Sequence, residues 1–147
     1  MFFSKSIFAL MVALSALFFV GCGASGAQFS GFQTPKDGNA MVYVYRPSSL
    51  AGMAVSYTAS ADTGDQNITI GNISNGSYNK AEVPANKEVE IWAKTEAKSS
   101  VTIDTEDKVI YCIKAGLGMG FMVGRPKFEK VDMQTCQKEI VKTKLDK

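Results

Sequence analysis

Hydrophobic and polar residues alternate with a period of two along most of the chain after residue 39. Because successive side chains of a β-strand point to opposite faces, this alternation predicts strands with a buried face. The predicted strands cover residues 40–46, 53–60, 66–70, 77–83, 88–94, 99–105 and 108–115. Short strands separated by turn residues every ~8–12 positions predict an all-β fold, an antiparallel β-sandwich of about seven strands, with a small barrel as the alternative.

Two of these strands are apolar on both faces, and the one at residues 108–115 is therefore predicted to be central. In residues 40–46, Val42 and Val44 alternate with Tyr43 and Tyr45, and residues 108–115 have a similar pattern. After residue 134 the hydrophobic spacing fits both a short C-terminal helix and a frayed edge strand, and both interpretations stay open.

The first twenty-one residues have the features of a bacterial export signal. Lys5 gives a positive start, and residues 7–20 form an apolar run broken only by Ser15. A run of this length is short for the ~30 Å core of a bilayer, but it is typical of a signal peptide. We therefore predict that residues 1–21 are a targeting segment.

The segment Phe19-Val20-Gly21-Cys22 resembles the bacterial lipobox, in which a small residue precedes a cysteine that is lipidated before cleavage. The resemblance implies a lipoprotein whose mature chain begins at an acylated Cys22, held in the membrane by two or three acyl chains. Gly23 rather than aspartate follows, which in lipoproteins implies the outer membrane, on its periplasmic or surface face. The alternatives are an ordinary secretory peptide and a retained membrane helix.

Residues 22–39 are rich in glycine, alanine, serine and glutamine. This composition predicts a flexible tether that joins the anchor to a β-sandwich domain at residues 40–147. The whole chain has 147 residues, near the size of one domain, and 46% of them are hydrophobic.

Charge and histidine content argue against several functional classes. Sixteen basic and fourteen acidic residues are spread along the chain, so no stripe typical of nucleic-acid binding appears. The chain has no histidine and three cysteines, which excludes histidine triads and four-ligand Cys/His zinc sites. We find no metal-ligand spacing, cofactor motif or nucleophile elbow, and we predict that the protein is not an enzyme.

Cys112 and Cys136 remain in the mature chain, in an oxidising compartment. A bond between them would close a loop of about 25 residues and stabilise the fold by about 3–3.5 kcal/mol. We predict this disulfide, with two buried thiols as the alternative.

Several sequence features resemble a family of uncharacterised small bacterial lipoproteins. They are Tyr43-Val44-Tyr45-Arg46-Pro47 soon after a lipobox, the turn at Pro84, Val109-Ile110-Tyr111-Cys112-Ile113 and the late Phe128-Glu129-Lys130-Val131. The resemblance covers about residues 40–140 and implies an immunoglobulin-like or prealbumin-like sandwich without an assigned activity. The family usually has a Pro-Gly turn before its middle strand, whereas this chain has Pro84-Ala85-Asn86.

Two regions are candidate binding sites. Tyr43, Tyr45 and Arg46 could hold a carboxylate or a sugar face, or they could pack and cap the sheet edge. In the glycine-rich segment 116–124, Leu117, Met119 and Phe121 could form an exposed loop for a protein partner. The alternative for that segment is a kinked strand crossing between sheets, with Leu117 and Phe121 in the core.

Asn67 is a candidate glycosylation site. Asn-x-Ser/Thr triplets begin at Asn67, Asn72 and Asn75, and the first stands in Asp65-Gln66-Asn67-Ile68-Thr69. That longer segment resembles the acidic-residue-first acceptor of bacterial periplasmic glycosylation systems.

Two functional hypotheses remain. The first is a membrane-anchored, non-catalytic interaction or envelope-assembly module with a protein partner. The second is a lipoprotein that binds a small ligand or inhibits a hydrolase through the Arg46 region.

Overall fold

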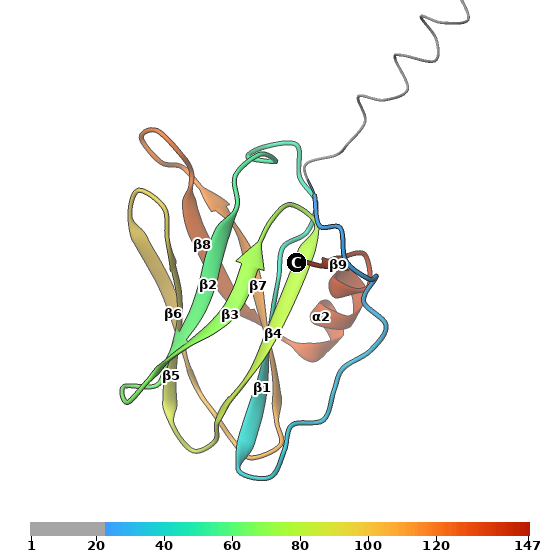
Figure 1. Ribbon diagram of the computed structural model, residues 1–147, viewed down its shortest axis with the longest axis vertical. Coiled ribbons are helices and arrows are strands. Elements are labelled where there is room, and N and C mark those ends of the chain that lie inside the picture. The colour runs from blue at the N-terminus through green and yellow to red at the C-terminus, as the bar shows by residue number, and fades with distance from the viewer. Residues whose placement is uncertain (1–22) are drawn as a thin grey trace, which may run out of the picture.

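The computed structural model describes residues 23–147 and consists mostly of β-strands arranged in two sheets, with one short C-terminal helix (Figure 1). The predicted signal peptide, the lipobox-like segment and Cys22 lie outside the described residues. The elements are β1 (Asn39–Tyr45), β2 (Tyr57–Asp62), β3 (Asn67–Ile73), β4 (Ser77–Pro84), β5 (Glu88–Lys94), β6 (Lys98–Asp104), β7 (Ile110–Gly118), β8 (Arg125–Val131), α2 (Met133–Ile140) and β9 (Lys144–Leu145). Within the described residues, no helix is long and apolar enough to cross a membrane.

The strands form a five-stranded sheet in the order β8-β7-β1-β4-β9 and a four-stranded sheet in the order β3-β2-β5-β6. Most neighbours are antiparallel, as the sequence predicts, but β1 pairs with β7 and β4 pairs with β9 in parallel. The five-stranded sheet is therefore mixed. A parallel pair needs a long crossover, and the chain completes the whole four-stranded sheet between β1 and β7.

Strand β7 lies inside the five-stranded sheet, as its two apolar faces predict, and β1 is the middle strand of that sheet. Val42 and Val44 point into the main core between the two sheets, which we call the inner core. Tyr43 and Tyr45 point to the other face, into a second cluster that we call the outer core. The inner core is mainly aliphatic, and its fully buried side chains include Ile91 and Ile113.

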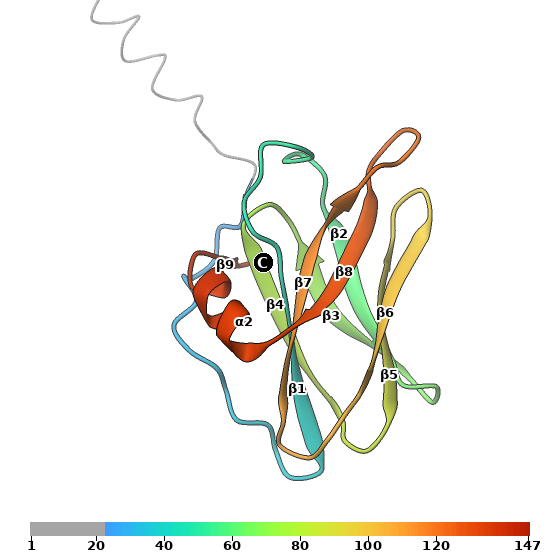
Figure 2. The same ribbon diagram turned by 180° about the vertical axis from the view of Figure 1, so that it is seen from behind.

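The outer core is covered by α2 and by the segment that precedes β1 (Figure 2). The predicted disulfide is confirmed: Cys112 on β7 is bonded to Cys136 on α2. Asp132 caps the helix, its carboxylate accepting from the Thr135 backbone N–H at 2.8 Å. The C-terminal stretch is thus a helix followed by a two-residue edge strand, so both interpretations of it were partly right.

The segment predicted to be a flexible tether packs against the domain instead. Phe29 is 8% exposed and makes edge-to-face contacts with Phe32, Tyr43 and Tyr78. Its backbone N–H donates to the Thr143 carbonyl at 3.0 Å. Two aromatic residues within an otherwise small and polar segment supply the apolar area that holds it in place.

The turn after Pro84 accommodates the missing glycine. Asn86 has a φ of 56°. Asparagine enters this left-handed region more readily than most side chains, so it can replace the glycine of a Pro-Gly turn.

Candidate functional site

Arg46 lies in the interior and holds a loop of its own chain. Its side chain is 3% exposed, with Nη1 donating to the Val55 carbonyl at 2.6 Å and Nη2 to the Gly52 carbonyl at 2.8 Å. Burial lowers the pKa of Arg46. The guanidinium therefore fixes the β1–β2 loop, residues 46–56, and contacts carbonyls rather than an acidic side chain.

Tyr43 and Tyr45 are fully buried in the outer core. The Tyr43 hydroxyl accepts from the Gln33 backbone N–H at 2.8 Å, and the Tyr45 hydroxyl donates to Glu139 Oε2 at 2.5 Å. Burial raises the pKa of both phenols. Lys114 Nζ lies 2.8 Å from Glu139 Oε1. The pKa of the Glu139 carboxyl is lowered, mainly by its bond to Lys114 and less by its hydrogen bond from Tyr45. The two tyrosines thus pack and bond internally.

The β7–β8 loop, residues 119–124, presents the other predicted binding residues. Met119 is 97% exposed and Phe121 is 91% exposed, whereas Leu117 packs against the inner core. The segment is therefore an exposed loop. The alternative, a strand crossing between sheets, places Leu117 correctly and Phe121 wrongly.

Glu96, in the β5–β6 turn, holds this exposed loop. Its carboxylate accepts from the backbone N–H groups of Phe121 at 2.6 Å, Met122 at 2.9 Å and Val123 at 3.4 Å. Arg125 Nε lies 3.5 Å from Glu96 Oε1. The pKa of the Glu96 carboxyl is lowered by these contacts. The hydrogen bond from the Met122 amide contributes most, and those from the other two amides and from Arg125 contribute less.

The close approach of Glu96 requires glycine at position 120. A Cβ placed on Gly120 would lie 1.9 Å from Glu96 Oε1 and 2.8 Å from the Val123 carbonyl oxygen. Any other residue would push the carboxylate away from the amides. The apolar side chains of the loop are thus exposed on a backbone that is held in place.

The β1–β2 loop lies beside the β7–β8 loop. Leu50 is 88% exposed and Met53 is 45% exposed. Gly52 packs so closely on Leu117 that a Cβ there would lie 2.4 Å from Leu117 Cδ1. Both loops are at one end of the sandwich, where the described chain also begins (Figures 1 and 2). We call this the loop end: residues 46–56, 74–76, 95–97 and 119–124.

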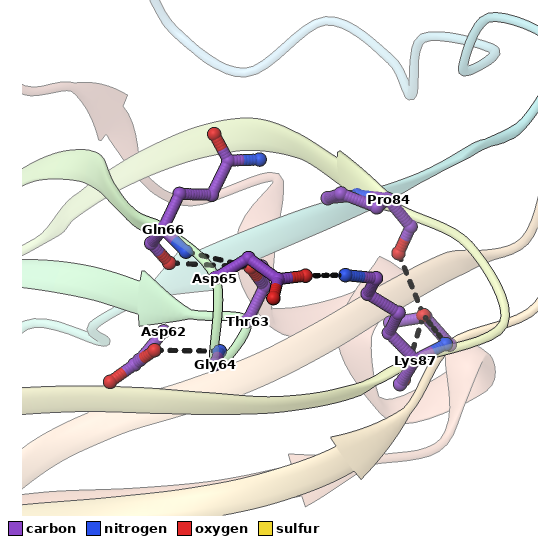
Figure 3. Close-up of polar contacts among 8 residues, drawn as sticks. Asp62, Thr63, Gly64, Asp65, Gln66, Pro84 and Lys87 are labelled. Carbon is purple, nitrogen blue, oxygen red and sulfur yellow. Dashed lines mark hydrogen bonds and ion pairs between the residues drawn. The ribbon is translucent and has the colours of Figure 1, made fainter.

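The other end of the sandwich is polar and held by side-chain contacts. In the β2–β3 turn, Asp62 Oδ1 accepts from the Gly64 N–H at 2.8 Å, and Asp65 forms an ion pair with Lys87 (Figure 3). Thr105 Oγ1 donates to the Pro84 carbonyl at 2.8 Å. None of these residues exposes a large apolar side chain.

Asn67 is exposed at the start of β3, next to this turn. Its Oδ1 accepts from Trp92 Nε1 at 3.0 Å. Glycosylation of Asn67 stays a prediction. Peptide mass analysis of the protein from a glycosylating host checks it: we expect a glycan on the Asn67 peptide and none after Asn67→Gln, and a wholly unmodified wild-type peptide would contradict it.

Sequence reasoning missed five residues of the loop end: Leu50, Met53, Glu96, Met122 and Val123. The predicted strand at residues 53–60 includes Met53, whereas β2 begins at Tyr57, and Met53 therefore lies in the loop with Leu50. Glu96 is 25 positions from Phe121, and no local pattern links the two. The uncharged run at 116–124 was the one available signal.

We compared the chain with protein-family models, curated proteins and solved structures. No family model matches it, and neither a curated protein nor a solved structure is significantly similar.

Proposed function

We propose that this protein is a lipid-anchored, non-catalytic interaction module of the bacterial envelope, attached to the outer membrane through Cys22. The contact surface in this proposal is the loop end. The observation that carries it is the pair of held loops that expose Leu50, Met119, Phe121 and Met122 to solvent. Soluble proteins seldom keep so many large apolar side chains together in water unless another surface covers them.

The connection to the anchor supports the same assignment. The Gly26 backbone N–H donates to the Leu145 carbonyl at 2.9 Å, so the chain is bonded to the domain four positions after Cys22. A lipid on Cys22 would therefore keep the domain close to the membrane rather than on a long tether. That proximity favours a function carried out at the membrane surface.

The proposal assigns no catalysis, because the groups with strongly perturbed environments have structural partners. Burial raises the pKa of Tyr57 to about 12, and its hydroxyl donates to the Gly116 carbonyl at 2.8 Å. Glu96 is occupied by backbone amides and Arg46 by carbonyls. Groups engaged in this way are poorly placed to transfer protons to a substrate.

The second hypothesis, a ligand or a hydrolase bound at the Arg46 region, has less support. Arg46, Tyr43 and Tyr45 are all buried, and opening the site would expose β1. For the fold, we propose the finer assignment of an immunoglobulin-like sandwich, supported by two packed sheets of short strands.

Metabolic labelling with radioactive palmitate tests the anchor. In bacteria that express the full chain, we expect label on the wild type and on a Ser25→Ala control, and none on Cys22→Ser. The labelled protein should also partition into detergent. An unlabelled wild-type protein would contradict the anchoring.

Thiol modification tests the contact surface. Phe121→Cys, treated with a water-soluble maleimide, should react severalfold more slowly in isolated envelopes than in detergent solution, because another surface covers the loop. Gln66→Cys, exposed at the other end, serves as the matched control and should react equally in both. Equal rates for Phe121→Cys in the two preparations would contradict a contact there.

A further inference from the structure

The exposed apolar side chains are concentrated at the loop end. Seven large hydrophobic side chains are exposed among the described residues, and six of them lie in the β1–β2 and β7–β8 loops. These six are Leu50, Met53, Met119, Phe121, Met122 and Val123. An apolar surface of this kind is typical of a site that is covered by a protein or a membrane.

The two loops and the beginning of the described chain form one continuous surface. Ala51 and Gly52 line a shallow depression together with Met119 and Gly120. On the other side of the same loop, Met53 lines depressions shared with Gly23. Figures 1 and 2 show both loops and the first described residues at the same end of the molecule.

The chain outside the described residues limits where a membrane can be. The Gly26 N–H is bonded to Leu145, and four steps of backbone separate residue 26 from residue 22. Fully extended, they reach about 14 Å at ~3.3–3.6 Å per residue. If Cys22 carries the lipid, as proposed above, the bilayer surface must lie within that distance of Gly26, beside the loop end.

Charge distinguishes the two ends of the sandwich. The loops of the loop end and their flanking residues contain one acidic residue, Glu96. They contain four basic residues: Arg46, Lys94, Lys98 and Arg125. At the other end, residues 34–38, 63–66, 85–87 and 105–109 with their flanks contain three lysines and seven carboxylates: Asp37, Asp62, Asp65, Glu88, Asp104, Glu106 and Asp107. An anionic surface therefore attracts the loop end and repels the other end.

We propose that the loop end docks on the phospholipid bilayer that holds the lipid anchor. Met119, Phe121 and Met122 enter the boundary between headgroups and acyl chains, and Leu50 follows from the neighbouring loop. Lys94 and Arg125, which border the β5–β6 and β7–β8 loops, contact anionic headgroups. This inference rests on the anchoring proposed above, and it turns a domain held at one point into one with a fixed orientation.

Apolar residues bordered by basic residues are the combination that binds the interface of anionic membranes. The hydrogen bonds that Glu96 accepts from the β7–β8 loop also favour docking. They hold the loop backbone in place, so little conformational entropy is lost when the side chains of the loop enter the lipid.

Depth measurement with a spin label tests the proposal. The full chain is expressed in bacteria, purified in its lipidated form, labelled at Phe121→Cys and reconstituted in protein-free vesicles of phosphatidylethanolamine and phosphatidylglycerol. We expect the label to be accessible to oxygen and severalfold less accessible to a water-soluble nickel complex than a label at Gln66→Cys. Equal nickel accessibility at the two positions would overturn the proposal.

Two further outcomes separate the possible explanations. If the Phe121 label is shielded in native envelopes but exposed in protein-free vesicles, the occupant is a protein and bilayer docking is overturned. In vesicles of phosphatidylcholine alone we expect a shallower label, and equal depth in both lipids would overturn the role of the basic residues.

Flotation of the vesicles distinguishes this inference from the anchoring on which it depends. Protein that is left behind when the vesicles float in high salt shows that the anchor itself is wrong. Protein that floats with a label still exposed to nickel shows that the anchor is right and the docking is wrong.

Discussion

The two faces of strand β1 pack against different kinds of layer. The inner face meets the four-stranded sheet, a continuous layer of aliphatic side chains. The outer face meets one short helix and an irregular segment, and it is held by aromatic contacts, hydroxyl hydrogen bonds and a disulfide. The difference shows that a strand can be buried on both sides without a second regular sheet, provided that specific contacts replace part of the apolar area.

The largest difference should appear in a matched pair of substitutions, Ile113→Ala on the inner face and Ile140→Ala on the outer face. Both side chains are fully buried. We expect the free energy of unfolding to fall by about 4 kcal/mol for Ile113→Ala and by about 2–3 kcal/mol for Ile140→Ala, because helix α2 can relax into the space. Urea unfolding followed by circular dichroism measures both, and equal losses would contradict the difference between the layers.

Removal of the disulfide tests the outer layer as a whole. The double substitution Cys112→Ala and Cys136→Ala should lower the free energy of unfolding by about 3 kcal/mol, because a closed loop of 24 positions is released. Treatment of the wild-type protein with a reductant should give a similar loss. A protein whose stability is unchanged by both treatments would show that α2 is held by packing alone.

Phe29→Ala tests the segment that replaces the predicted tether. Phe29 keeps a slightly exposed edge, so we expect a loss of about 2–3 kcal/mol, near the lower limit for a buried phenylalanine. Hydrogen exchange of the Gly26 and Phe29 amides should accelerate, while exchange in the inner strands changes little. Unchanged exchange at these two amides would mean that the segment is held by its backbone bonds.

Tyr45→Phe should have the smallest effect, about 1 kcal/mol at neutral pH, because it removes one hydrogen bond and no apolar area. The bond also has a pH signature. In the folded protein the pKa of Glu139 is below its ordinary value. The ionised carboxylate therefore stabilises the fold at pH values above the pKa of the unfolded state, and this stabilisation is lost as pH falls through the pKa of the folded state. The difference between wild type and Tyr45→Phe should therefore shrink in acid, and a constant difference would contradict the assignment.

Alternation along the chain was enough to predict most strands and the interior place of β7, because each of these strands has at least one buried face. It failed for β8, Arg125–Val131, whose charged residues conceal a pattern in which Pro126 and Phe128 face inward. The parallel pairing of β1 with β7 has no local signature. Register and partner choice depend on contacts between residues far apart in the sequence.

The candidate site was predictable only in part. The uncharged segment 116–124 identified Met119 and Phe121, but Glu96 was missed because it meets them only in three dimensions. Arg46 was a candidate ligand contact because an arginine at the end of a strand, beside two tyrosines, can bind a carboxylate or a sugar face. Its partners are backbone carbonyls, which carry no sequence identity and so leave no trace in the pattern.

The bonds between the two ends of the described chain have a consequence for biogenesis. Gly26 and Phe29 are bonded to Leu145 and Thr143, so, in a chain exported as proposed above, the outer layer can be completed only after residues 143–145 have crossed the membrane. We expect the strands of the four-stranded sheet to pair while export continues, and the disulfide and the N-terminal segment to be secured last. Assembly then depends on the slow closure of distant contacts, and the protein is most vulnerable to proteases just before residues 143–145 arrive.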